Sequence, residues 1–296
     1  MPPKPVGSNF PKSDAVEMWY NSRRDMSKVK KFLVFLALPV LGGVAWLCQR
    51  GGEGASAEAD LVIAGLGGFR GIIAEVVWFR ADRLQDDGRY SEMAQLANIL
   101  TTLEPHTPEV WAYAAWNLAY NISVMMPTPE DRWRWVEAGL KLLRDDGLRL
   151  NPTSPELHRE IAWLFLSKIG GAVDEASPLY RTKWEREVES VAGDWRKLKM
   201  EPSLVSFIDR EYGRQNWHDP KASALYWAHH GLAQKPMGAV RAELRQVLYQ
   251  TLMVASVEDA RFAPRALQAM REAYSEAPSA ALGDLIGRFR AKFGLP

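Results

Sequence analysis

The stretches that decide the fold are Leu-Glu-Pro-His-Thr-Pro-Glu at residues 103–109 and Leu-Asn-Pro-Thr-Ser-Pro-Glu at residues 150–156. Each contains a first proline, which cannot continue a helix, and then Thr or Ser followed by a second proline and an acid. A hydroxyl residue, a proline and an acid in that order form a usual helix start. Each stretch therefore predicts the end of one helix and the start of the next, and the first prolines, Pro105 and Pro152, lie 47 residues apart.

Further helix starts of this kind lie at Thr128, Ser177 and Asp219, each of which is followed by proline. Long alternations of apolar and polar residues, which would indicate strands, are missing after residue 60. The pattern therefore predicts an all-α body. The expected helices span residues 60–86, 90–103, 108–125, 130–149, 155–169, 176–199, 203–213, 219–233, 238–254, 259–275 and 279–293.

The two stretches resemble the end of a tetratricopeptide repeat (TPR), in which a helical hairpin closes in Leu-x-Pro before the next helix. With Pro105 as the closing proline, Gly88 and Tyr90 lie in the turn between two helices, where the repeat favours Gly-x-Tyr. Ala115 then takes the small position at which the helices of the next hairpin approach closely. The second unit is about thirteen residues longer than the usual repeat, so the resemblance is to TPR-like hairpins of uneven length.

This resemblance implies a TPR-like helical-hairpin solenoid over residues 60–200, continued by a C-terminal helical region over residues 201–296. Stacked hairpins bury each other's apolar faces, and the 12 tryptophans of the chain suit such interfaces. Further characteristic segments are GGFRG, WFRADRLQ, AWNLAYNIS, EDRWRWVEAGL and ALYWA. In these segments the chain is similar to a class of bacterial membrane-anchored repeat proteins, a similarity that implies no particular activity.

An uncharged apolar run, FLVFLALPVLGGVAWLC, occupies residues 32–48. It lies at the short end of the length needed to cross the roughly 30 Å of hydrocarbon in a bilayer. Residues 1–31 carry seven basic and three acidic side chains, and positive charge is retained in the cytoplasm. We therefore expect a flexible basic cytoplasmic tail over residues 1–31, a transmembrane signal anchor over residues 32–48 and a linker over residues 49–59. In a bacterium the chain would be a single-pass inner-membrane protein with a periplasmic body.

Three other interpretations of the apolar run stay open. It can be the core of a cleavable signal, with Ala55, Ser56 and Ala57 as the small-residue cleavage site. It can be a lipoprotein signal that ends at Cys48, although Leu47 is bulky for the position before a lipidated cysteine. The third is a buried helix of the body, which the basic flank disfavours.

Composition narrows the functional classes. Lys and Arg total 37 and Asp and Glu 36, a balance that does not indicate a nucleic-acid partner. The single cysteine excludes a disulfide framework. The sequence contains no His-Glu-x-x-His, no Gly-x-Ser-x-Gly and no phosphate-binding glycine loop in the right context. We therefore expect no catalytic residue, cofactor or metal, and a protein that is not an enzyme.

Three segments contain side chains that suit binding as well as packing. In residues 115–123, two asparagines four positions apart share one helical face. There they can bind the backbone of an extended peptide. The alternative is that they form a buried asparagine pair. Arginines alternate with tryptophans in residues 130–140, and aromatic and histidine residues crowd residues 216–232. The candidate partner-binding residues are Asn117, Tyr120, Asn121, Arg132, Arg134, Tyr226, His229 and His230.

These features predict a membrane-anchored scaffold for protein–protein interaction, or an accessory subunit of a membrane complex. Its helical-repeat surface would bind one or more membrane-associated proteins, an inference from architecture. The alternative is an all-α ligand-binding or enzymatic domain with a pocket near Asn117, Asn121, His218, His229 and His230. His218 and one of the adjacent histidines can hold a metal, but a structural role for these histidines is the default interpretation. A structural subunit without a site of its own is the third possibility.

Overall fold

The computed structural model describes the C-terminal part of the chain and a few residues before it. The residues described are 80, 83, 84, 87, 89, 92, 99–171 and 174–296. The expected tail, membrane segment and linker, residues 1–59, lie outside them, as does most of residues 60–98. Every regular element of the described part is helical, which confirms the all-α prediction. No helix in this part is long and apolar enough to cross a bilayer.

Most expected helices are found within a few residues of their predicted bounds. The helix expected to end at residue 254, α13, continues to Glu258. The α-helices are α5 (Pro108–Trp116), α6 (Ser123–Met125), α7 (Pro129–Lys141), α8 (Leu148–Leu150), α9 (Pro155–Trp163), α10 (Ser177–Val191), α11 (Pro202–Tyr212), α12 (Pro220–Ala233), α13 (Gly238–Glu258), α14 (Ala263–Glu276) and α15 (Ala280–Phe293). Three π-helical turns continue α5, α7 and α9, namely η1 (Asn117–Ile122), η2 (Leu142–Gly147) and η3 (Leu164–Ile169). Two described 3-10 turns are η4 (Trp195–Leu198) and η5 (Ala260–Phe262).

The helix starts follow the local signals in the sequence. Thr128 accepts a hydrogen bond from the Asp131 N–H at 3.1 Å, and Ser154 accepts one from the Leu157 N–H at 3.3 Å. Proline occupies the first turn of both helices, where its missing N–H is not needed. Both helices therefore begin within one residue of the predicted position.

The helix expected over residues 176–199 is shorter than predicted. α10 ends at Val191, and the backbone reverses at Ala192 and Gly193, whose φ angles are 47° and 85°. A left-handed residue ends an α-helix, and glycine adopts a positive φ without strain. The chain then forms the short η4 turn before α11 begins.

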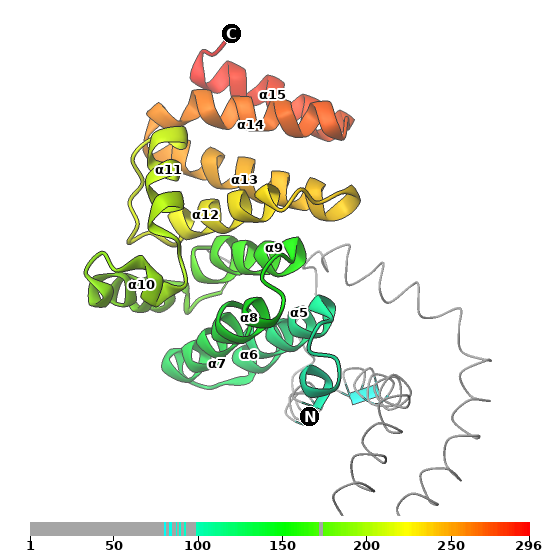
Figure 1. Cartoon of the computed structure of the whole chain (residues 1–296). Helices are drawn as coiled ribbons and strands as arrows, with labels where there is room; N and C mark the ends of the chain where they lie inside the picture. The colour runs from blue at the N-terminus through cyan, green and yellow to red at the C-terminus, as the bar shows by residue number, and fades with distance from the viewer. Residues whose placement is uncertain are drawn as a thin grey trace, which may run out of the picture. The chain divides into compact units, whose positions relative to one another are not determined.

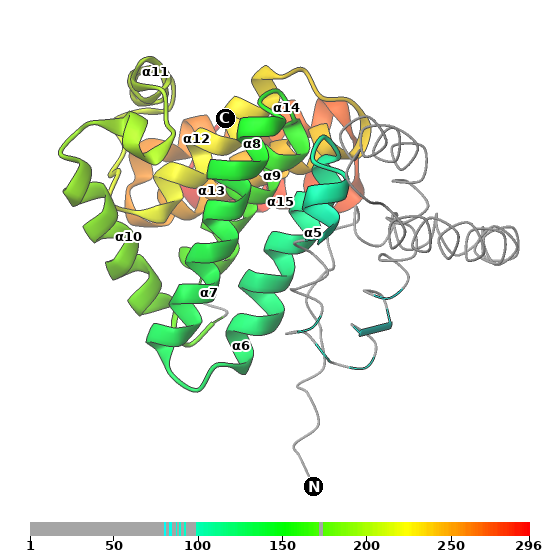
Figure 2. The ribbon, with the colours of Figure 1, turned by 60° about the horizontal axis from the view of Figure 1, so that its bottom comes forward.

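The chain divides into two compact units, residues 1–104 and 105–296. Within the second unit, α9, α12, α13, α14 and α15 pack side by side in that order, as Figure 1 shows. α5 contacts α9, and α7 packs against the η1 turn that follows α5. α10 leaves this row and packs against η3 and α7, while α11 crosses α12 at a steep angle (Figures 1 and 2). One continuous cluster of buried apolar side chains extends from Trp111 to Phe289.

Two glycines allow neighbouring helices to approach closely. A Cβ atom at Gly139 of α7 would lie 2.8 Å from the Ala115 carbonyl oxygen of α5. A Cβ atom at Gly231 of α12 would lie 2.8 Å from Leu244 Cδ2 and 2.9 Å from His158 Cβ. A larger residue at either position would therefore force a neighbouring helix or side chain to move.

Candidate functional site

The two predicted asparagines lie in the π-helical turn η1 and bind each other. Asn121 Nδ2 donates a hydrogen bond to Asn117 Oδ1 at 3.2 Å. The Asn117 side chain is fully buried and Asn121 is half-buried. This geometry matches the alternative interpretation, a buried asparagine pair, and neither residue lines the two clefts described below.

Tyr120 and Arg132 join a polar cluster around Lys168 and Asp174. The Tyr120 hydroxyl lies 2.7 Å from Ser167 Oγ, and the Lys168 ammonium lies 5.4 Å from the centre of the Tyr120 ring. The Arg132 guanidinium lies 3.6 Å from the Asp174 carboxylate. The cluster therefore joins residues of η1, α7 and η3. The polar groups of Tyr120 and Arg132 already have partners within the protein.

Asp174 is the centre of this polar cluster. Its carboxylate accepts hydrogen bonds from Lys168 Nζ at 2.6 Å, from the Tyr180 hydroxyl at 3.1 Å and from the Ala176 N–H at 2.9 Å. Burial disfavours the charged form, but the hydrogen bond from Lys168 and the other donors outweigh burial and hold the pKa of Asp174 below its ordinary value. Burial also lowers the pKa of Lys168. These hydrogen bonds, together with the Arg132–Asp174 ion pair, stabilise the junction of η3, α7 and α10.

The remaining predicted residues are divided between surface and core. Arg134 is exposed and pairs with Asp131 at 3.0 Å. Tyr226 is fully buried, and its hydroxyl accepts a hydrogen bond from the Glu201 N–H at 2.8 Å. His230 packs against a buried histidine of α9. The predicted residues are therefore not gathered on one surface.

His229 lines a cleft of about 340 Å³ between α11, α12, α13 and α14, which we call the arginine cleft. Leu248 and Ala269, which are buried, form its apolar floor. Its four charged lining residues are half-buried and provide a polar rim. The rim residues are Glu211, Arg245, Arg265 and Glu272.

One wall of the arginine cleft is aromatic. The Tyr212 hydroxyl lies 2.9 Å from His229 Nδ1, and the Phe207 ring centre lies 5.1 Å from that of His229. Phe207 is 37% exposed, although it is a large apolar side chain. Burial lowers the pKa of His229, so the imidazole is neutral at pH 7 and shares a hydrogen bond with Tyr212.

The charges of the rim balance one another. Arg245 pairs with Glu272 at 2.7 Å and with Glu276 at 2.8 Å, and Arg265 lies 3.4 Å from Glu211. The Arg265 and Glu211 side chains are exposed, and an exposed pair of this kind contributes only about 0–1 kcal/mol of stability. Arg265 can therefore exchange its carboxylate partner at little cost when another molecule enters the cleft, whereas Arg245 is more buried and is held by two carboxylates.

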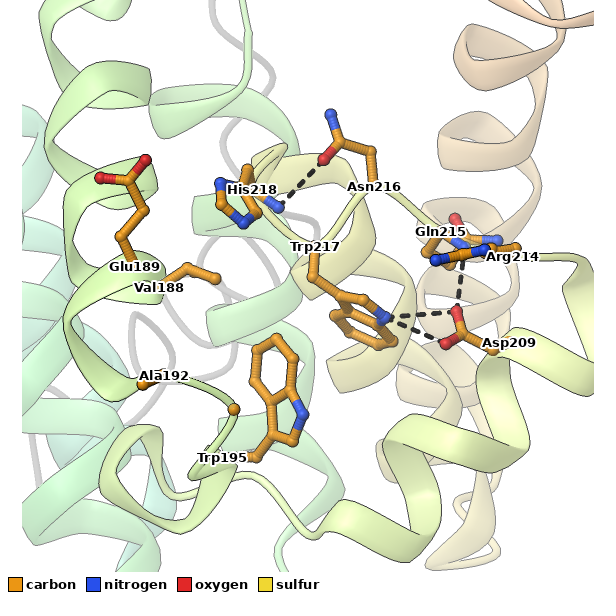
Figure 3. Close-up of a pocket in the computed structure, with 11 residues that line it drawn as sticks. Val188, Glu189, Ala192, Trp195, Asp209, Arg214, Gln215, Asn216, Trp217 and His218 are labelled. Carbon is orange, nitrogen blue, oxygen red and sulfur yellow. Dashed lines mark hydrogen bonds between the residues drawn. The ribbon is translucent and has the colours of Figure 1, made fainter.

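A second cleft, of about 440 Å³, lies between the end of α10, η4 and the segment that precedes α12 (Figure 3). The ring centres of Trp195 and Trp217 lie 5.3 Å apart on one side, and we call it the tryptophan cleft. Trp217 Nε1 donates to both carboxylate oxygens of Asp209, at 3.2 and 3.3 Å. His218 and Glu189 lie along the other edge.

The two clefts separate the histidines that the alternative interpretation placed in one pocket. His218 lines the tryptophan cleft, His229 lines the arginine cleft, and His230 lines neither. His218 and His229 are eleven positions apart, most of them in α12, which is on the order of 16 Å along a helix axis. A metal shared by His218 and the adjacent histidines is therefore not supported, because α12 holds them apart.

The sequence does not single out Phe207, Arg245 or Arg265, which lie on three different helices. The available signal is the position of Phe207 within α11. Val205 and Ile208 are buried on the apolar face, so an exposed phenylalanine between them departs from the amphipathic pattern. The arginines give no local signal, because their relevance depends on which helices become neighbours.

Comparisons with known proteins find no matching family model, no similar curated protein and no similar solved structure. Within the described residues, two clefts and one exposed aromatic wall are the features that bear on function.

Proposed function

We propose that this chain is a membrane-anchored protein-interaction scaffold, or an accessory subunit of a membrane complex, built from TPR-like hairpins. In this proposal residues 32–48 cross a bacterial inner membrane, residues 1–31 are cytoplasmic and the helical body is periplasmic. The arginine cleft binds a segment of a partner protein. The anchor raises the local concentration of the scaffold near membrane-associated partners.

The order of the helices supports the scaffold. α12 to α15 are consecutive in the chain, are joined by short connections and pack side by side. Such an arrangement buries most apolar side chains between neighbours and leaves continuous outer surfaces for binding. The close contact of Gly139 with Ala115 also fits a hairpin whose two helices approach at small residues.

The observation that carries the proposal is the arginine cleft itself. Protein interfaces combine a buried apolar centre with a polar rim, and they are enriched in aromatic residues and arginine. This cleft has an apolar floor, an exposed Phe207 and two arginines whose ion pairs lie at the rim. Among the residues predicted from sequence, His229 lies in it.

The cleft favours a particular partner chemistry. The floor and Phe207 suit an apolar side chain, and Arg265, whose pair with Glu211 is exposed, suits a carboxylate beside it, which a guanidinium can bind through two hydrogen bonds. The cleft is too small for a folded domain. We infer that the partner presents a short segment with an apolar side chain flanked by Asp or Glu.

Site-specific photocrosslinking of the full-length chain in native membranes tests this function. A photoreactive residue replaces Gln268, which lines the cleft, and in a control chain it replaces the exposed Arg288 of α15. We expect the same membrane protein to be recovered repeatedly from position 268 and not from position 288. Equal recovery from both positions would contradict the proposal.

A matched pair of substitutions then tests the chemistry of the cleft. Phe207 and Tyr274 are 37% and 39% exposed, and only Phe207 lines the arginine cleft. Phe207→Ala should reduce crosslinking at position 268 about tenfold, because it removes an aromatic contact of hot-spot type. Tyr274→Ala should leave it unchanged, and an equal loss in both variants would assign the effect to general destabilisation.

A further inference from the structure

Three potential metal ligands meet at the edge of the tryptophan cleft. Glu185 and Glu189 lie four residues apart on α10 and share a helical face, and His218 approaches them from the segment before α12. One ligand atom of each residue lies within 4.8 Å of those of the other two. Figure 3 shows the Glu189 and His218 side chains on the same edge of the cleft. In the part of the chain that the structure describes, no other trio of His, Cys, Asp or Glu side chains comes this close.

His218 is held in position by its neighbours in sequence. Trp217, on one side, is 9% exposed and is hydrogen-bonded to Asp209. Asp219, on the other side, accepts a hydrogen bond from the Lys221 N–H at 2.9 Å and begins α12. The backbone of a residue between two anchored neighbours is already ordered, so only the side chain of His218 has to be fixed when it binds a ligand.

The two carboxylates face each other without compensation. Within the described residues, neither the Glu185 nor the Glu189 side chain has a hydrogen bond or an ion pair, and neither does the His218 ring. Like charges four residues apart on a helix destabilise it, and a cation between them would remove that repulsion. All three side chains are exposed, so an ion can reach them directly from solvent.

We propose that Glu185, Glu189 and His218 bind a divalent transition-metal ion of the zinc class. Imidazole nitrogen and carboxylate oxygen are both ligands that Zn²⁺ accepts, whereas Ca²⁺ and Mg²⁺ prefer oxygen alone. Three protein ligands leave a fourth position for water or for a molecule in the tryptophan cleft. The bound ion connects α10 to the segment before α12 and so stabilises one edge of that cleft.

Metal titration of the purified full-length chain, without a polyhistidine tag and after chelator treatment, tests this site. Co²⁺ is added first because its visible absorption reports the coordination number, and Zn²⁺ binding is then measured by calorimetry. We expect saturable one-to-one binding. His218→Asn and the double substitution Glu185→Gln/Glu189→Gln should each weaken Zn²⁺ binding at least about tenfold, since each removes ligands.

Two controls separate this site from general effects. His106 is exposed and lies outside the cluster, so His106→Asn should leave the affinity unchanged. Zn²⁺ should raise the melting temperature of the unmodified chain and not that of the His218→Asn variant. Absence of saturable binding would overturn the proposal. Binding that persists at full strength in both site variants would place the ion elsewhere and would also overturn it.

Discussion

The buried His158, which packs against the half-buried His230, makes the core sensitive to acid. Their ring centres lie 4.4 Å apart, and His158 Nδ1 lies 2.6 Å from the Ser154 carbonyl oxygen. Burial, and then the neighbouring His230, lower the pKa of His158 to about 4. In the unfolded chain a histidine has a pKa of about 6.5. Between these values the unfolded state binds more protons, so stability is complete above about pH 6.5 and is lost as the pH falls toward 4.

Acidification from about pH 7 to about pH 5 should therefore reduce the free energy of unfolding by about 2 kcal/mol through His158. The melting temperature, measured by circular dichroism on the full-length chain, should fall by about 4–8 °C. In His158→Gln, which cannot be protonated, the His158 contribution to this dependence should be lost, and only the contributions of His229 and His230, whose pKa values burial also lowers, should remain. His106→Asn removes an exposed histidine and should retain it, and an unchanged dependence in His158→Gln would contradict the assignment.

Exposure decides which charged residues can act on a partner. Lys168 and Asp174 are 5% and 7% exposed in their side chains, so separating them would leave a buried charge without compensation. Arg265 and Glu211 are 41% and 39% exposed, and water can solvate either one when the pair opens. The Lys168–Asp174 pair therefore stabilises the fold, whereas the Arg265–Glu211 pair can open and bind a partner protein.

At the scale of the helices, the π-helical turns change which face a residue occupies. η1, η2 and η3 each contain six residues and interrupt the regular α-helical hydrogen bonding of the first three long helices of the second unit. A prediction based on 3.6 residues per turn therefore misplaces the side chains that follow. Asn117 and Asn121 lie within η1, and they bind each other rather than facing an open groove.

The contact between α5 and α7 predicts a strong effect for a small substitution. Gly139→Ala places a Cβ atom 2.8 Å from the Ala115 carbonyl oxygen, a backbone atom that moves only with its helix. We expect a loss of about 1–3 kcal/mol in the free energy of unfolding, measured by urea denaturation. Gly287 of α15 has open space around its Cα, so Gly287→Ala should stabilise the protein by up to about 1 kcal/mol. A neutral Gly139→Ala variant would contradict this close approach.

At the scale of the whole molecule, the second unit has its own core. The buried apolar cluster extends from α5 to α15 within residues 105–296. We therefore expect a chain of residues 105–296 to fold alone, with a helical circular dichroism spectrum and one cooperative thermal transition. A fragment that ends after α12 should fold poorly, because it exposes the faces that α13 covers. A non-cooperative transition of the 105–296 fragment would contradict an independent core.

The positions of the helices could be predicted because their signals are local. A cap such as Ser154 acts on an N–H three residues away, and the proline after it affects only the first turn. The shorter α10 shows the limit of such signals. Its left-handed end residue is Ala192, whereas the residue in this position is usually glycine. The amino-acid sequence alone thus determined the all-α class and most helix bounds.

Tertiary structure alone decided the candidate sites. The arginine cleft unites Phe207, His229, Arg245 and Arg265, which come from four helices. The proposed metal ligands likewise unite α10 with a residue just before α12. Such groups form only when helices pack at a given angle and rotation, and packing depends on the complementarity of whole faces rather than on residues three or four positions apart. The sequence therefore determines where each helix begins, and the packing of the helices determines which side chains meet in a site.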